Sequence, residues 1–109
     1  MEISLRDISP SDRIMIRTQN SEYRFSVLDP EERRGILTGG SLGDNRRNAI
    51  LVGTLSGAAN NFAGDGSRLK TGARALFYLT AKNGVERLIT SIITSLKRTE
   101  SSGEQKEAA

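Results

Sequence analysis

The sequence predicts an all-β fold, a small antiparallel barrel or barrel-like sandwich of about six strands with a disordered C-terminal tail. Apolar and polar side chains alternate with a period of two in residues 13–18, 22–28 and 73–81, as in strands that bury one face. Turn-forming residues separate these segments, and Asn83-Gly84 is a typical hairpin sequence. A sheet that closes on itself also leaves no edge open to other chains, which favours the barrel.

The residue types that the chain lacks exclude several kinds of chemistry. The 109 residues suit one domain and include no cysteine and no histidine. This excludes a disulfide framework, a zinc site built on these ligands, a thiol nucleophile and a Ser-His-Asp triad. The acids lie mostly in expected turns, and no pair of them marks an acid–base centre. We therefore expect a protein that is not an enzyme and that has no metal or other cofactor.

Charge and hydropathy bear on location and partners. The net charge is +3, and twelve of the sixteen basic residues are arginines. No apolar run approaches the roughly 20 residues of a membrane span. The N-terminus lacks the apolar core of a signal peptide. With no cysteine and no targeting segment, we expect a cytoplasmic protein of bacterial type, without a membrane span.

The expected barrel-like domain covers residues 13–98. An N-terminal arm, residues 1–12, precedes it and either frays or forms a small amphipathic turn on the barrel surface through Ile3, Leu5 and Ile8. Residues 99–109 contain no large apolar side chain and cannot bury enough surface to fold. They are the expected disordered tail.

The domain is expected to begin with a hairpin of strands 13–18 and 22–28. Asn20 tolerates the positive φ of the tight turn between them. In the next turn Asp29 can accept hydrogen bonds from the backbone that follows, and Gly35 can adopt the left-handed conformation.

Two further strands are expected at residues 36–38 and 49–55. The first runs into Gly39-Gly40, and paired glycines in a strand usually mark a bulge or a bend at a barrel corner. Residues 56–72 show no clear period, so we expect a long loop that is either functional or mobile.

The last two strands are expected at residues 73–81 and 85–98. Asn83-Gly84 between them predicts a type I′ turn with positive φ at both positions. The final strand is rich in β-branched residues, and we expect it to bend near Ser91. A helix over Leu88–Leu96 is an alternative, because the apolar residues there also follow a helical spacing.

Basic residues cluster in the expected connections and are the candidate binding residues: Arg33, Arg34, Arg46, Arg47, Arg68 and Lys70. Arginine suits bidentate contacts with phosphate or carboxylate, so the expected partner is a nucleic acid or an acidic protein. Hairpin connectivity sends successive loops to alternate ends, so loops 29–35 and 56–72 would share one positive rim. Ion pairing of these cations with the thirteen acids is the alternative.

One pattern resembles a known signature. Arg13-x-x-x-Arg17 followed by Asp65-x-Ser67 is similar to the PilZ signature, an RxxxR element and a D/N-x-S-x-x-G element on a six-stranded barrel. The resemblance implies a cyclic di-GMP sensor in which arginines grip guanine edges and phosphates. The chain departs from this pattern in three ways: Lys70 replaces the final glycine, the gap is long, and both arginines lie within a strand.

A second resemblance covers residues 13–98. It is carried by Arg17-Thr18-Gln19-Asn20-Ser21-x-Tyr23, Leu37-Thr38-Gly39-Gly40 and Ile89-Thr90-Ser91-Ile92-Ile93. These segments resemble a group of short, uncharacterised bacterial proteins that share an R-T-x-N-S-x-Y start, a paired glycine and a closing T-S-hydrophobic strand. The resemblance implies a small β-rich fold and assigns no activity and no functional residue.

The sequence therefore predicts a non-enzymatic binding module that contacts a polyanion or an acidic partner through its arginine-rich loops. One alternative is a structural or assembly protein that forms a homo-oligomer through an unpaired edge strand or the apolar face of Ile89–Ile93. The other is the PilZ-like sensor of a cyclic dinucleotide.

Overall fold

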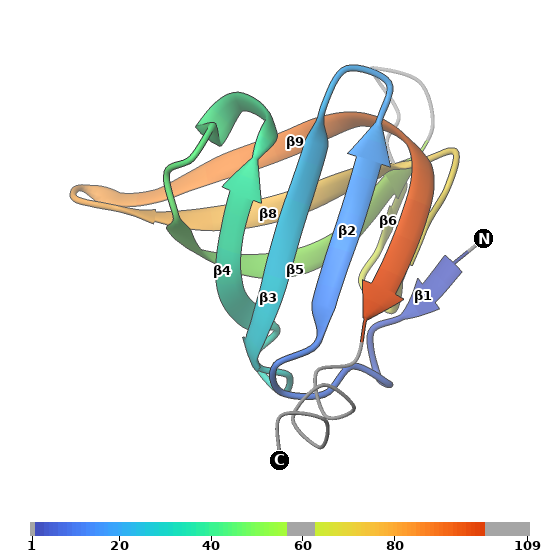
Figure 1. Cartoon of the computed structure of the whole chain (residues 1–109), viewed down its shortest axis with the longest axis horizontal. Helices are drawn as coiled ribbons and strands as arrows, with labels where there is room; N and C mark the ends of the chain where they lie inside the picture. Colours follow the sequence, from blue (N-terminus) through green and yellow to red (C-terminus); the bar gives the residue numbers. More distant parts are fainter. Residues whose placement is uncertain (1, 57–62, 100–109) are drawn as a thin grey trace, which may run out of the picture.

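The fold is a closed antiparallel barrel (Figure 1). The computed structural model describes residues 2–56 and 63–99. Its elements are β1 (Glu2–Ser4), β2 (Arg13–Thr18), β3 (Glu22–Asp29), β4 (Arg34–Gly39), the 3-10 turn η1 (Gly40–Leu42), β5 (Arg47–Ser56), β6 (Ala63–Asp65), β7 (Arg68–Lys70), β8 (Arg74–Ala81) and β9 (Gly84–Thr99). The order around the barrel is β4-β3-β2-β9-β8-β5, and β5 closes it on β4. The predicted six-stranded barrel is confirmed.

Alternate side chains of the six strands fill the barrel. Phe25 of β3 and Phe77 of β8 come from opposite walls and meet with their ring centroids 5.5 Å apart, inclined by 56°. Both are fully buried among other core side chains, which include Ile14, Ile16, Val27, Leu37, Leu51 and Ile93. The period-two pattern of the sequence is thus the inside–outside pattern of the barrel.

The N-terminal segment is part of this core. β1 pairs with β7, and three side chains that follow the amphipathic pattern are buried: Ile3, Leu5 and Ile8. The carboxylate of Asp12, a residue only 2% exposed, accepts a hydrogen bond from the backbone N–H of Ser9 at 2.8 Å and pairs with Arg98 at 3.1 Å. A buried carboxylate needs such partners. They tie the segment to β9, in agreement with the amphipathic alternative, although β1 itself was not predicted.

The first hairpin forms as predicted, with β3 one residue longer than expected. Asp29 Oδ1 accepts hydrogen bonds from the two backbone N–H groups that follow Pro30, also as predicted. The left-handed residue of this turn is Arg33 (φ 58°) and not Gly35. Gly35 lies in β4 instead, where an added Cβ would overlap the carbonyl of Ser26 and the ring of Phe25.

Two turn conformations differ from the prediction. Neither Asn20 nor Asn83 has a positive φ in the described chain. Ala81 pairs with Gly84, so Lys82 and Asn83 form the two-residue loop of the β8–β9 hairpin. The hairpin was predicted correctly but its type I′ turn was wrong, because the positive φ falls one position later, at Gly84 (126°). Glycine accepts this conformation without a Cβ clash.

Part of the segment expected to be a long loop is sheet. β6 pairs with the end of β5, and β7 pairs with β1. The loop prediction was therefore wrong for these two short strands. No local pattern indicates β7, because its partner β1 lies more than sixty residues away along the chain. Residues 57–62, in the same expected loop, lie outside the described chain. Thr99 ends β9, and the remainder of the expected tail lies outside the described residues.

β9 is a single strand with a bend, and the helix alternative over Leu88–Leu96 is wrong. In the described chain no helix is long and apolar enough to cross a membrane.

The register of β9 with β8 shifts beside the predicted bend at Ser91. There Thr90 turns inward, where its hydroxyl accepts a hydrogen bond from the N–H of Ala75 at 3.0 Å and donates to the carbonyl of Ser91 at 2.7 Å.

This bulge separates two apolar residues that were expected to share a face. Residues four apart in a regular strand point to the same side. The extra residue of the bulge reverses this, so Ile89 is 39% exposed outside the barrel and Ile93 is buried inside it. The predicted continuous apolar face of Ile89–Ile93 is therefore wrong.

The paired glycines after β4 form the predicted bend. Gly39 (φ 97°) ends the strand, and Gly40 (φ 51°) begins η1. A Cβ on Gly40 would overlap the ring of Tyr23, which is buried below it. Gly43 has a similar left-handed φ of 61°, but a Cβ there would meet no atom within 4 Å.

This contrast predicts that Gly40→Ala destabilises the barrel more than Gly43→Ala. Left-handed strain lowers the free energy of unfolding by about 1–2 kcal/mol in both variants. The overlap with Tyr23 adds about 1–3 kcal/mol in Gly40→Ala alone. Urea denaturation of both variants measures the difference, and equal losses would contradict the packing role of Gly40.

Candidate functional site

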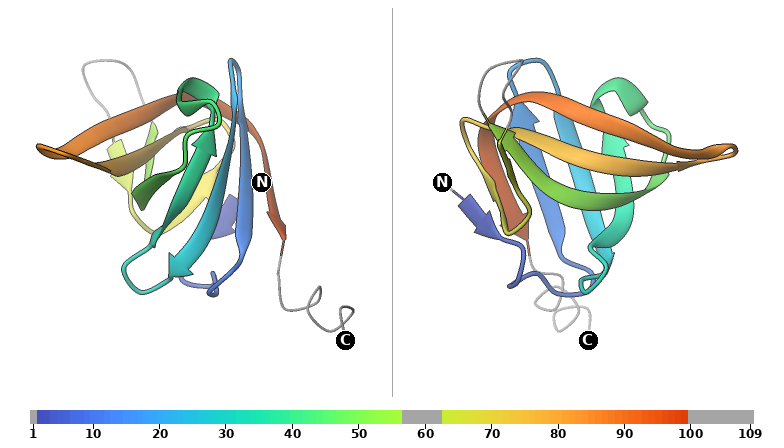
Figure 2. Two further views of the ribbon diagram at one scale, coloured as in Figure 1. Left: turned by 60° about the vertical axis from the view of Figure 1, so that its left-hand side comes forward. Right: turned by 180° about the vertical axis from the view of Figure 1, so that it is seen from behind.

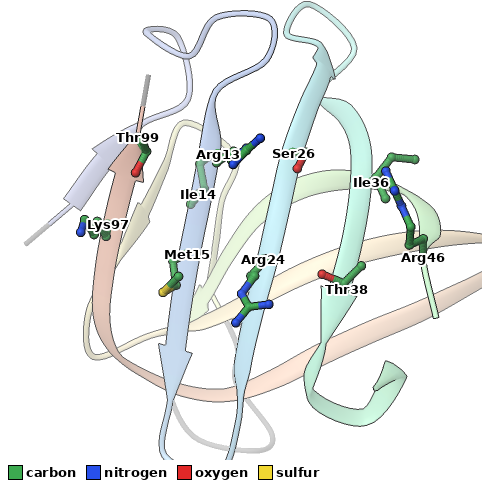
Figure 3. A pocket seen from close by; sticks show the side chains of 10 residues that line it. All are labelled: Arg13, Ile14, Met15, Arg24, Ser26, Ile36, Thr38, Arg46, Lys97 and Thr99. Atoms are coloured by element: carbon green, nitrogen blue, oxygen red, sulfur yellow. The ribbon is translucent and has the colours of Figure 1, made fainter. Parts of the chain in front are cut away.

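An open cleft of about 670 Å³ lies on the outward side of β9, β2, β3 and β4 (Figure 3). It is lined by Arg13, Ile14, Met15, Arg24, Ser26, Ile36, Thr38, Arg46, Lys97 and Thr99. Four of these residues are basic and none is acidic. We call the surface formed by Arg13, Arg24, Arg46 and Lys97 the cationic face.

Strand register arranges the outward side chains of the cleft in two rows. The first row, from β9 to β4, holds Thr99, Arg13, Ser26 and Ile36. The second row holds Lys97, Met15, Arg24 and Thr38 in the same order. Arg46, just before β5, continues the second row beyond β4. Neighbouring strands are about 4.8 Å apart, so the five strand positions from β9 to β5 place these cations within about 20 Å across the sheet.

Burial of the apolar residues between them turns these cations outward. Ile14 and Ile16 enter the core from β2, so Arg13 must face the cleft. On β3 the buried residues Tyr23 and Phe25 flank Arg24 in the same way. The cationic face is thus a consequence of strand alternation.

The cationic face carries more positive charge than its neighbours neutralise. Arg13, Arg46 and Lys97 form no ion pair with any other residue that the structure describes. The side chain of Arg24 is 68% exposed and lies 3.6 Å from Glu22. The same carboxylate also contacts Arg17 at 3.1 Å, so its single charge is shared. Such a surface attracts anions.

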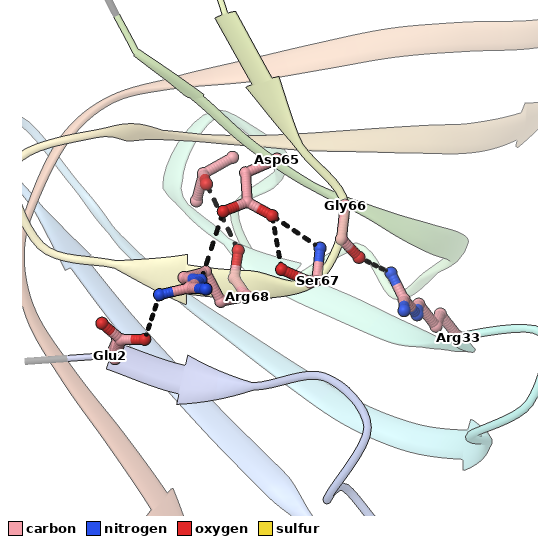
Figure 4. A network of polar contacts seen from close by, with 7 residues as sticks. Glu2, Arg33, Asp65, Gly66, Ser67 and Arg68 are labelled. Carbon is pink, nitrogen blue, oxygen red and sulfur yellow. Dashed lines mark hydrogen bonds and ion pairs between the residues drawn. The ribbon is translucent and has the colours of Figure 1, made fainter.

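Two of the sequence-predicted residues meet at the β6–β7 turn (Figure 4). Arg33 donates a hydrogen bond to the carbonyl of Gly66. Arg68 lies 3.2 Å from Asp65 and 2.8 Å from Glu2. Loops 29–35 and 56–72 therefore come together as expected. The guanidinium groups of Arg33 and Arg68 form contacts within the protein there. Lys70 ends the short strand that begins at Arg68.

The other predicted residues separate. Arg34 pairs with Glu32 at 3.4 Å and lies 4.0 Å from Asp29. Arg47 donates to the carbonyl of Thr80 at 2.9 Å and pairs with Glu86. Arg46, next to it, belongs to the cationic face.

The six predicted loop residues do not include Arg13, Arg24 and Lys97, and the sequence indicated Arg13 only through the PilZ-like element. The alternation of residues 13–18 and 22–28 already indicated that the two arginines point away from the core. Lys97 joins them only through the pairing of β9 with β2, where it lies opposite Met15. That pairing joins opposite ends of the chain, and no local pattern indicates it.

The two elements that resemble the PilZ signature lie on β2 and at the β6–β7 turn. Arg17 of the first element contacts Glu22. In the second element the carboxylate of Asp65 accepts hydrogen bonds from the hydroxyl of Ser67 at 2.5 Å and from its backbone N–H at 2.9 Å. These bonds, and to a smaller extent the charges of Arg68 and Lys70, hold the pKa of Asp65 below its ordinary value.

The groups that line the cleft are of the kind that can contact an anion. Its lining offers four cationic groups and the hydroxyls of Ser26, Thr38 and Thr99. The described residues contain no group of three or more acids that could hold a metal ion. No family model, curated protein or solved structure matches the chain.

The lowered pKa of Asp65 predicts a pH-dependent stability. A carboxyl group whose pKa is lower in the folded than in the unfolded protein stabilises the fold when the pH is above its unfolded pKa. This stabilisation is lost as the pH falls through the folded pKa. Wild type should therefore exceed Asp65→Asn in free energy of unfolding above about pH 5. The difference should shrink as the pH falls below the ordinary value of 3.8.

Urea denaturation of both proteins between about pH 2.5 and about pH 7, a range that spans the titration of an aspartate, measures this difference. Asp44→Asn, in an exposed loop, is the matched control and should differ little from wild type at any pH. A constant difference between wild type and Asp65→Asn would contradict the prediction.

Proposed function

We propose that this protein is a non-enzymatic binding module that holds a nucleic acid strand by its phosphates on the cationic face. The observation that carries the proposal is the convergence of Arg13, Arg24, Arg46 and Lys97 on one cleft whose lining contains no acid. Contacts of Arg and Lys with phosphates supply most of the affinity in binding without sequence preference.

The remaining cleft residues favour contact with the nucleic acid backbone. Hydroxyl groups, here those of Ser26, Thr38 and Thr99, commonly bind phosphate oxygens and sugars. The cleft lining contains no aromatic side chain on which a base could stack. Binding should therefore depend weakly on base sequence and strongly on salt.

The shape of the site favours a single strand over a duplex. Proteins that read a duplex insert a helix or a β-ribbon into a groove. The cationic face is instead a hollow on the side of a sheet, open along two rows of side chains (Figure 3). An extended phosphate backbone can lie along such rows, whereas the cationic face itself carries no projecting helix or β-ribbon that would enter a groove.

Binding through phosphate contacts predicts a steep salt dependence. Four phosphate contacts on a single strand give a slope of log Kobs against log salt of about −3. Arg13→Gln, Arg24→Gln and Lys97→Gln should each weaken binding and make the slope shallower by about 0.7, because each removes one contact. Fluorescence anisotropy with a labelled oligothymidylate at several salt concentrations measures both quantities.

The matched controls are Arg33→Gln and Arg68→Gln. They remove the same charge from the β6–β7 turn, where both side chains already have contacts within the chain. Both controls should bind like wild type. If instead they weaken binding and the three face variants do not, the ligand lies on the loop rim and the proposal is wrong. Tighter binding of poly-glutamate than of oligothymidylate would point to an acidic protein partner and also reject it.

A further inference from the structure

The first half of β9 is an open sheet edge on a projecting hairpin (Figures 1 and 2). β8 pairs with one edge of this half, but β2 covers the other edge only from Ile93 to Thr99. The β2–β3 turn reaches two residues further, through hydrogen bonds to Ile92 and Ser91. Between Gly84 and Thr90, this second edge makes no backbone hydrogen bond to any residue in the described chain.

The alternation of the ladder shows which backbone groups face the open edge. The carbonyl of Thr80 is turned toward β5, where it accepts a hydrogen bond from Arg47. Thr80 and Val85 are therefore a pair without mutual hydrogen bonds. The N–H and C=O groups of Val85, and by alternation those of Arg87 and Ile89, point to the open edge.

Two apolar side chains are exposed along this edge. Val85 is 70% exposed and Ile89 is 39% exposed. On the same outward face, Tyr78 of β8 is 40% exposed beside Arg87. An exposed edge with apolar side chains is a template for another strand, and proteins normally protect it.

We propose that Val85–Ile89, the β9 edge, pairs with the same edge of a second copy of this chain, antiparallel about a two-fold axis at Arg87. Val85 and Ile89 lie two residues on either side of Arg87. The axis therefore sets Val85 of each copy opposite Ile89 of the other, on one face of a continuous sheet. The β2–β3 turn over Ser91 prevents the shared ladder from extending to that residue.

The arrangement has one unfavourable contact, because Arg87 of each copy lies opposite Arg87 of the other. Like charges directly opposite weaken strand pairing. The dimer should therefore be reversible, and salt should strengthen it by screening this repulsion. The cationic face uses the other half of β9, at Lys97 and Thr99, so dimerisation and nucleic acid binding can be tested separately.

Two substitutions at one position test the pairing. Arg87→Thr removes the repulsion and keeps the backbone N–H, so the dissociation constant of its dimer should be about threefold lower than that of wild type. Arg87→Pro removes the same charge together with the N–H, so its dimer should be at least tenfold weaker. The Arg87 N–H makes no bond to β8, so both variants should fold. Sedimentation velocity of the full chain at about 1 to 200 µM, a range that covers the dissociation constants of weak dimers, measures the dissociation constant of each variant.

Circular dichroism checks the fold, and Val85→Lys is a second variant that should also weaken the dimer at least tenfold. Tyr78→Thr changes the same apolar face away from the edge and should leave dimerisation unchanged. The proposal is wrong if wild type and Arg87→Thr both stay monomeric over this range. It is also wrong if folded Arg87→Pro dimerises like wild type, or if Tyr78→Thr abolishes the dimer, which would indicate packing of faces instead of pairing of edges.

Discussion

The contact between Phe25 and Phe77 at the barrel centre determines what the outside of the molecule presents. Each ring fixes the inward side of its strand, and neighbouring residues must then point outward. Arg24, beside Phe25, thus joins the cationic face, and Tyr78, beside Phe77, joins the apolar face of the projecting hairpin. A shift of β3 by one residue would turn Arg24 inward and bury its charge, and the same shift of β8 would turn Tyr78 inward. The packing of the core therefore also determines which side chains are exposed on the surface.

Closure of the barrel depends on two long strands that change neighbours. β5 pairs with β4 through its first residues and then with β6, after a bulge at Gly53, whose φ is 146°. β9 has β8 beside its first half and β2 beside its second half. Each of these strands is too long for one barrel neighbour to pair with the whole of its edge. On β5 the remaining edge pairs with β6, whereas on β9 no described strand pairs with the remaining edge, and the exposed apolar residues lie there.

Local patterns in the sequence predict most of the barrel and little of its site. Alternation placed the hairpin at residues 13–28, and Asn83-Gly84 placed the last turn, because both signals act between near neighbours. The pairing of Glu2–Ser4 with Arg68–Lys70 brings distant segments together, so no local signal predicts it. The same limit applies to the basic residues. Whether a cation is available depends on which acid faces it, as when Glu2 meets Arg68. Of the six residues predicted from loop position, Arg46 alone belongs to the cationic face.

The ion pair between buried Asp12 and partly exposed Arg98 explains how a positive surface persists beside an acid. Asp12 immediately precedes Arg13 and would reduce the charge of the face if its carboxylate pointed into the cleft. It turns instead toward the barrel interior, where Arg98 and the backbone of Ser9 hold it. Arg98 is neighbour to Lys97 and Thr99 on β9, so the same contact keeps the end of that strand beside β2. The N-terminal segment therefore contributes to the cationic face without lining it, because it supplies the carboxylate that fixes both strands.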